Sequence, residues 1–202
     1  MIKTVILDLG NVIVPVDFRR CHDALAGVCS YPVNEIPKRI RSTGLVERFE
    51  TGEASPDDFF RKVSTVLNMN VTYAEFWDIW SSIFAPEPII PENMLEGLCR
   101  ERRLLLLSNT NVIHFAMIQQ KHSPLLRHFH SCVLSYEVGA LKPSPRIYQE
   151  AIARAGCLPE ECFFTDDNAP FVAGAQQQGI DAVQFESLEQ LQQDLRDRAI
   201  SW

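Results

Sequence analysis

Five short apolar runs that lack polar–apolar alternation constrain the fold of this chain more than any other feature. A strand buried on both faces has no solvent side, so its residues need not alternate, as is typical of parallel sheets covered by helices. The runs are Thr4–Leu7, Leu104–Leu107, Cys132–Leu134, Cys162–Phe164 and Ile180–Phe185. We therefore expect a mainly parallel sheet whose two faces are both buried.

Helix signals separate the later runs. Ser144 before a proline begins one predicted helix, and Gly156 ends it. Residues 168–179 and 187–198 predict two more helices. Alternation of strand and helix indicates an α/β fold with a doubly wound, Rossmann-like sheet.

Residues 17–91 interrupt this alternation, because they contain helix signals and no convincing strand. Asp17 precedes an amphipathic run, Ser55 precedes Pro-Asp-Asp, and Thr72 with Glu75 makes a capping box. Prolines mark both margins of the segment. We predict an α/β core domain formed by residues 1–16 and 92–202, and a small α-helical cap domain, residues 17–91, inserted after the first strand.

Charge and composition exclude several classes of function. The 202 residues carry a formal net charge of -7, which argues against nucleic-acid or anionic-membrane partners. No apolar stretch is long enough to span a membrane, and Asp8 and Asn11 interrupt the N-terminal run too early for a secretion signal. The six cysteines form no CxxC pair, so reduced thiols and a cytoplasmic location are expected. The sequence supports no prediction of an oligomeric state.

Polar residues stand where the apolar runs stop. Asp8 follows the first run, Ser108 the second and the pair Asp166–Asp167 the fourth, while Lys142 lies just beyond the third. In an open parallel sheet, ligands bind in the crevice at the carboxyl ends of the strands. Each residue alone has an ordinary explanation as a turn or helix-start residue, but their joint placement predicts one site.

These residue types suit phosphoryl transfer. The Asp8 carboxylate can attack phosphorus only where the phosphoryl charge is neutralised. The pair Asp166–Asp167 offers hard oxygen ligands for Mg²⁺, Lys142 a positive charge, and Ser108 a hydroxyl donor. Backbone N–H groups near Gly10 and Asn109 complete the predicted phosphate cradle.

Four strings of the sequence resemble the motifs of the haloacid dehalogenase-like (HAD) hydrolase superfamily. They are Asp8-Leu9-Gly10-Asn11-Val12, Leu107-Ser108-Asn109-Thr110-Asn111, Leu141-Lys142-Pro143 and Phe164-Thr165-Asp166-Asp167-Asn168. The resemblance spans the chain and is greatest for the branch of alpha-D-glucose-1-phosphate phosphatases; the phosphatase domain of soluble epoxide hydrolase is a more distant relative.

The resemblance implies a Mg²⁺-dependent phosphatase that forms an aspartyl-phosphate on Asp8. It implies that Ser108 and Lys142 bind phosphate. The implied metal ligands are Asp8, the Gly10 carbonyl and Asp167, with Asp166 in support. The expected partner is a small phosphorylated metabolite, such as a sugar phosphate, because a helical lid admits compact substrates.

Gly10 departs from the family pattern. Most phosphatases of this superfamily carry a second Asp there as general acid/base, a group that typically contributes about 100- to 10,000-fold to the rate. Asp17 and Glu137 are the candidates for a replacement. The charged cap residues Glu47, Arg48 and Glu50 could face the active site, but solvent is the default expectation for them.

Two other functions remain open. A 2-haloacid dehalogenase uses the same nucleophilic Asp without metal, but its relatives carry Ser-Ser-Asn where this chain has Asp166-Asp167-Asn168. A catalytically weak module that binds a phosphorylated ligand is favoured by Gly10 and Phe171. Retention of Asp8 and Lys142 argues against such a module.

Overall fold

The computed structural model describes all residues, Met1–Trp202, and contains one five-stranded sheet. All pairings are parallel, in the order β3-β2-β1-β4-β5. The strands are β1 Thr4–Leu7, β2 Arg103–Ser108, β3 Ser131–Leu134, β4 Cys162–Asp166 and β5 Asp181–Gln184. Each predicted run therefore forms a strand, and the predicted fold class is confirmed.

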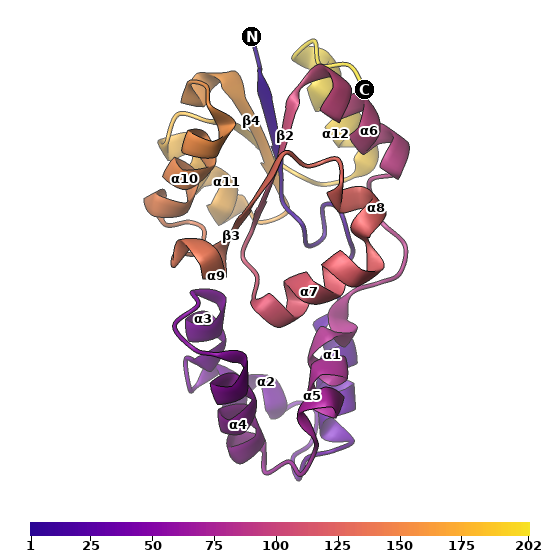
Figure 1. The fold of residues 1–202 in the computed structure, drawn as a ribbon, viewed down its shortest axis with the longest axis vertical. Coiled ribbons are helices and arrows are strands. Elements are labelled where there is room, and N and C mark those ends of the chain that lie inside the picture. Colours follow the sequence, from indigo (N-terminus) through magenta and orange to yellow (C-terminus); the bar gives the residue numbers. More distant parts are fainter.

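Helices cover both faces of the sheet (Figure 1). One face packs against α6 (Glu92–Glu101), α7 (Val112–Lys121), α8 (Ser123–Leu126) and α12 (Leu188–Asp197). The other face packs against α9 (Ser135–Val138), α10 (Pro145–Ala155) and α11 (Ala169–Gln177). Short 3-10 turns lie at Ser81–Ile83 and Pro159–Glu161.

The cover of helices on both faces explains why polar and apolar residues do not alternate along the strands. Along β1, Val5 and Leu7 enter the apolar cluster on one face, while Ile6 enters the cluster on the other. Phe163 and Phe164 of β4 divide in the same way, and all of these side chains are fully buried. Both sides of the pleat are apolar because neither side meets water.

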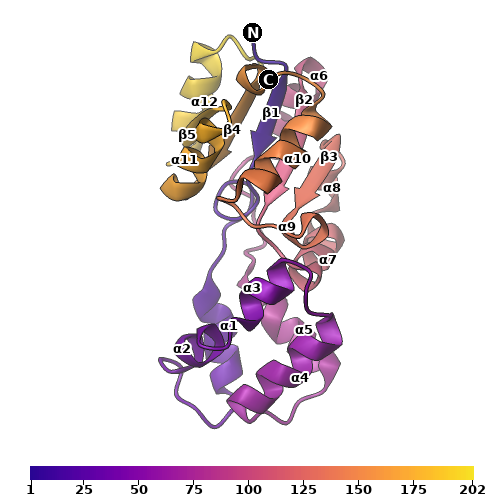
Figure 2. The ribbon, with the colours of Figure 1, turned by 90° about the vertical axis from the view of Figure 1, so that its left-hand side faces the viewer.

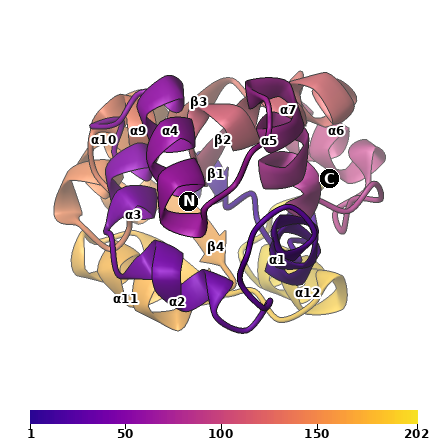
Figure 3. The same ribbon diagram turned by 90° about the horizontal axis from the view of Figure 1, so that it is seen from below.

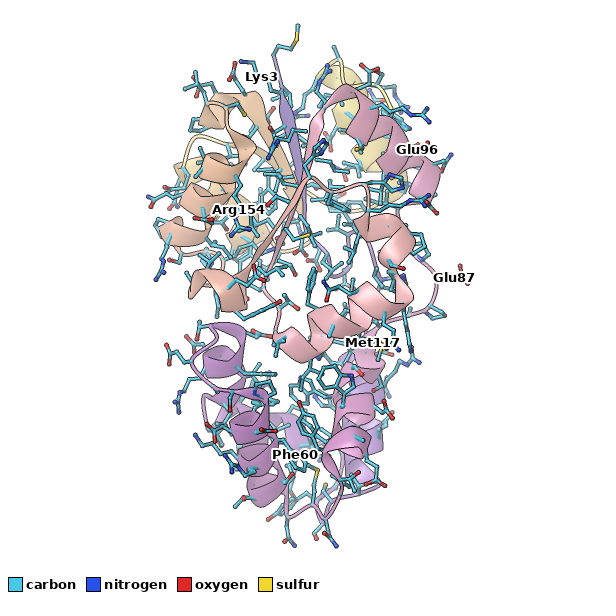
Figure 4. The ribbon with its side chains drawn as sticks, in the orientation of Figure 1. Lys3, Phe60, Glu87, Glu96, Met117 and Arg154 are labelled. Carbon is cyan, nitrogen blue, oxygen red and sulfur yellow. The ribbon has the colours of Figure 1, made fainter.

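Helices α1–α5 form a separate helical segment with its own apolar cluster. Their bounds are α1 Phe18–Ala26, α2 Ile36–Arg41, α3 Leu45–Glu50, α4 Pro56–Leu67 and α5 Tyr73–Trp80. Aromatic rings fill its interior: Phe49 stacks on Phe59 with the ring centroids 4.2 Å apart, and Trp80 meets Phe59 edge-on with the centroids 4.8 Å apart. Phe60 lies in this interior (Figure 4) and contacts the Phe76 ring.

The helical segment lies beyond the carboxyl ends of the strands (Figure 2). Lys3, which precedes β1, lies at the opposite end of the molecule (Figure 4). The helix starts at Asp17, Ser55 and Thr72 are confirmed, because each of these side chains accepts a backbone N–H at its helix N-terminus. None of the helices of the protein has the length and apolar character needed to cross a membrane.

Helix α7 joins the segment to the core. Its Ile113 belongs to the apolar cluster of the helical segment, and its His114 ring stacks on Trp80 at 5.7 Å between centroids. His114 Nε2 lies 3.0 Å from the Trp80 carbonyl, and Nδ1 lies 3.0 Å from the amide nitrogen of Asn111. A neutral ring satisfies both contacts by donating from Nε2 and accepting at Nδ1.

Burial lowers the pKa of His114 to about 4, although the contact with the Trp80 carbonyl opposes the shift. In the unfolded chain the same imidazole titrates near pH 6.5. The unfolded state therefore binds more protons between these two values, and protonation at lower pH favours unfolding.

We predict that His114 makes the protein less stable as pH falls from about 6.5 to 4, by up to about 1.4 kcal/mol per pH unit. Urea unfolding across this range, compared between the parent and His114→Gln, measures that contribution as a difference in slope. His130→Gln, which removes an exposed histidine, is the control. Equal slopes for the parent and His114→Gln would contradict the assignment.

Candidate active site

The site lies where the winding of the sheet changes direction. From β1 the chain adds β2 and then β3 on one side, and then crosses over to place β4 on the other side of β1. Crossovers leave β1 and β4 in opposite directions, so a crevice opens at the carboxyl ends of these two strands. Asp8 directly follows β1, and Asp166 ends β4. Seen from below, β1 and β4 lie between α3 and α4 on one side and α1 and α5 on the other (Figure 3).

A cavity of about 230 Å³ occupies this crevice. The predicted site residues that line it are Asp8, Gly10, Ser108, Asn109, Lys142 and Asp167. Asp166 is fully buried behind them and reaches the site through Lys142. The structure thus brings all of the predicted site residues together from distant parts of the chain.

The Lys142 ammonium group is the centre of the site. Its Nζ donates to Asp8 Oδ1 at 2.6 Å, to Asp166 Oδ2 at 2.5 Å and to the Leu107 carbonyl at 3.0 Å. These contacts use every N–H of the group. The Phe171 ring closes the remaining side, with its centroid 5.3 Å from Nζ. Lys142 therefore orients Asp8, and its predicted contact with phosphate stays a prediction.

Charge in this buried site is tightly coupled. Burial lowers the pKa of Lys142, but Asp8 and Asp166 outweigh this effect and leave its pKa raised, so the ammonium stays charged. Burial raises the pKa of Asp8 to about 7; Lys142 opposes this rise and Asp166 adds to it. Further positive charge at the site would favour the ionised form of Asp8 that a nucleophile requires.

The carboxylates of Asp8, Asp166 and Asp167 form the single acidic cluster of the chain with metal-ligand spacing, their oxygens lying within 4.8 Å of one another. With only one ammonium among them, the cluster has an excess of negative charge that a divalent cation would neutralise. Gly10 lines the cavity, and its carbonyl accepts no hydrogen bond. Asn11 Nδ2 holds Asp167 Oδ2 at 3.1 Å. This all-oxygen donor set fits a hard cation such as Mg²⁺.

Asn109 fixes the Lys142 loop against the end of β2. Its Nδ2 donates to the Lys142 carbonyl at 3.1 Å, and its Oδ1 accepts the Lys142 N–H at 2.7 Å. The sequence predicts a role only for the backbone of Asn109, and the structure adds this contact of its side chain. Ser108 Oγ makes one long contact of 3.4 Å, to the Asn109 carbonyl, and is available to a ligand.

Neither candidate for the missing acid/base lines the cavity. Asp17 caps α1 by accepting the Arg19 N–H at 2.9 Å, and Glu137 lies in a separate surface cleft beside Arg146. Gly10 itself packs tightly, because a Cβ there would lie 3.2 Å from Val16 Cγ2.

Glu50, at the end of α3, lines the cavity instead and lies opposite the strand ends. Of the two possibilities that the sequence leaves for Glu50, the active site and solvent, the structure places it half-buried in the cavity wall. Helical spacing could have indicated this position: Leu45 and Phe49 are buried four residues apart, and Val46 and Glu50 form the adjoining stripe. Glu47 and Arg48 lie on the exposed side. His114 also lines the cavity.

Comparison with known proteins adds independent information. The family described as haloacid dehalogenase-like hydrolase matches residues 2–179. A D-ribitol-5-phosphate phosphatase of Bacteroides thetaiotaomicron is 26% identical over 200 residues, which cover 96% of this chain and 97% of that protein.

Two solved structures are also similar. A HAD family enzyme of Bacteroides thetaiotaomicron, in complex with magnesium and inorganic phosphate, superposes with a TM-score of 0.81 at 26% identity, covering 93% of this chain and 96% of that one. A HAD-like family hydrolase of Porphyromonas gingivalis has a TM-score of 0.84 at 26% identity, covering 97% and 98%. With its Rossmann-like sheet and a family match over most of its length, this chain belongs to the haloacid dehalogenase-like hydrolases.

Proposed function

We propose that this protein is a Mg²⁺-dependent phosphatase that hydrolyses small phosphate monoesters, of the sugar or sugar-alcohol class, through an aspartyl-phosphate on Asp8. The observation that carries the proposal is the position of Asp8, held by Lys142 beside an acidic cluster that fits a cation. The D-ribitol-5-phosphate phosphatase relative supports the substrate class.

Different residues have different roles in the proposed transfer of the phosphoryl group to Asp8. Lys142 holds Asp8 Oδ1 and so orients the carboxylate toward the cavity. The Ser108 hydroxyl and the backbone N–H groups near Gly10 and Asn109 donate to phosphoryl oxygens. Asp8, the Gly10 carbonyl and Asp167, with Asp166 in support, would hold Mg²⁺, which would supply the positive charge that neutralises the phosphoryl group.

We further propose that the helical segment acts as the cap of this site, with domain limits at residues 17–91. It contributes Phe18 and Glu50 to the cavity wall opposite Asp8. A cavity of about 230 Å³ enclosed in this way suits a compact metabolite and obstructs a phosphorylated macromolecule.

The acidic cluster argues against the metal-independent dehalogenase. A dehalogenase needs no cation, so Asp167 beside Asp8 and Asp166 would only add repulsion to its nucleophile. We expect no chloride release from 2-chloropropionate in metal-free buffer. Turnover of that compound without metal, followed with a chloride electrode, would support the dehalogenase instead.

Replacing the nucleophile tests the proposal most directly. Asp8→Asn should lower kcat/KM on phosphorylated metabolites by roughly 10,000-fold or more, because the amide cannot form the acyl-phosphate. Released phosphate across a panel of sugar and polyol phosphates measures the effect. Asp57→Asn, an exposed change in the first turn of α4, is the matched control. A binding module without catalysis would show no activity in any of the three proteins.

Metal binding can be measured without catalysis. Mg²⁺ at about 100 times its dissociation constant should stabilise the folded protein by about 2.7 kcal/mol. Asp167→Asn should weaken this effect while keeping the side-chain size. Thermal unfolding with EDTA and with added Mg²⁺ gives the comparison, and Asp57→Asn again serves as the control. Equal unfolding temperatures with and without Mg²⁺ in the parent protein would contradict the proposed metal site.

A further inference from the structure

A second cavity adjoins the catalytic one. It occupies about 440 Å³ within the helical segment and is lined mainly by apolar groups, including Ile40 and Trp80. The two cavities share Phe18, Glu50 and His114 in their walls. These residues form the junction between the charged floor of the site and the interior of the helical segment.

The junction is where the ester oxygen of a substrate would lie. A phosphoryl group next to Asp8 and Lys142 fills the floor of the catalytic cavity, which is closed beneath by the buried ends of β1 and β4. The organic group then extends toward the second cavity. The P–O bond that breaks therefore points at the junction, and a proton donor for the leaving oxygen must come from there.

Only one junction residue can transfer a proton. Phe18 has no exchangeable side-chain proton. His114 is buried with both ring nitrogens engaged, one by Trp80 and one by Asn111, and burial lowers its pKa to about 4. Glu50 makes no hydrogen bond or ion pair to any residue. The other carboxylates of the cavity wall are engaged, Asp8 by Lys142 and Asp167 by Asn11.

We propose that Glu50 is the general acid/base of this enzyme and supplies from the cap the function absent at Gly10. The proposal rests on the phosphatase function proposed above. In the first step an Asp8 oxygen bonds to phosphorus, the bond from phosphorus to the ester oxygen breaks, and the Glu50 carboxyl proton passes to the departing alcohol. In the second step water attacks phosphorus, its proton passes to the Glu50 carboxylate, and the bond to Asp8 breaks. The products are an alcohol and inorganic phosphate, and Glu50 regains its proton.

The surroundings of Glu50 suit both steps. Burial raises its pKa to about 7, and the neighbouring Glu47 adds to the rise. Both protonation states are then populated near neutral pH, as an acid that becomes a base requires. Other charged or titratable groups also surround Glu50. They are His22 and Arg41 in the wall of the second cavity, His114 at the junction, Asp8, Lys142 and Asp167 in the catalytic cavity, and Glu137 on α9, which packs on α3.

The test compares Glu50→Gln with Glu47→Gln, a matched change one turn earlier on the exposed side of α3. Both are assayed with Mg²⁺ on an alkyl phosphate, whose leaving group needs a proton, and on 4-nitrophenyl phosphate, whose leaving group does not. Glu50→Gln should lower kcat on the alkyl ester by about 100- to 10,000-fold. With 4-nitrophenyl phosphate it should keep a rapid burst of nitrophenol and then turn over slowly, because the phosphoenzyme lacks a base for hydrolysis.

Two further readouts separate proton transfer from a structural role. The mass of intact Glu50→Gln should show one added phosphoryl group during turnover, which the parent does not accumulate. The limb of the pH–rate profile near neutral pH, which reports the titration of Glu50, should be absent in Glu50→Gln. It should move to lower pH in Glu47→Gln, and it should remain in Glu50→Asp at a reduced rate.

Unchanged kcat for Glu50→Gln on the alkyl ester, or a change in KM alone, would overturn the role of Glu50 while leaving the phosphatase function intact. Loss of the nitrophenol burst together with the alkyl activity would also overturn it, because proton donation is not needed for that leaving group. A parent protein inert on every ester with Mg²⁺ would instead overturn the proposed function, and this inference with it.

Discussion

The buried ammonium group of Lys142 is the interaction on which the rest of the site depends. It joins the ends of β1, β2 and β4 by donating to Asp8, the Leu107 carbonyl and Asp166. Without it, the buried carboxylates would repel one another and take up protons. Two other features of the site hold the Lys142 ammonium in place. The Asn109 side chain binds the Lys142 backbone, and the parallel sheet brings the strand ends within reach of the ammonium group.

The walls of the site have contrasting chemistry. The wall formed by the α/β core is charged and rich in oxygen atoms that could bind a cation. The wall formed by the helical segment is mainly apolar and contains one unpaired carboxylate, Glu50. This contrast suits a substrate with an anionic end and a compact organic end. It also separates two tasks in space, because the proposed nucleophile Asp8 lies at the end of β1 and the proposed proton-transfer group lies on the helical segment. Movement of a helical segment that acts as a cap would then couple substrate entry to completion of the catalytic set.

Much of the fold could be predicted from local signals. The strands of the sheet follow from apolar runs, and α4 and α5 follow from caps whose hydrogen bonds are present in the structure. The short helices α2 and α3 were not predicted individually, because the residues before them, Glu35 and Gly44, make no side-chain cap. Such helices are held by packing against α4 and not by their own sequence.

The sequence by itself determined the parallel sheet, the inserted helical segment and the residues at the strand ends, because apolar runs, helix caps and motifs each depend only on residues close together in the sequence. Only the tertiary structure decided how these residues are used. It showed that Lys142 donates to Asp8, Asp166 and the Leu107 carbonyl, and that the His114 ring contacts Asn111 and the Trp80 carbonyl. It also showed that Glu50 lines the cavity while Glu47 is exposed. Burial and partner choice arise from contacts between distant segments. Helical spacing places Glu50 beside the buried stripe of α3, but only the packing of α3 against the core shows that a cavity lies there.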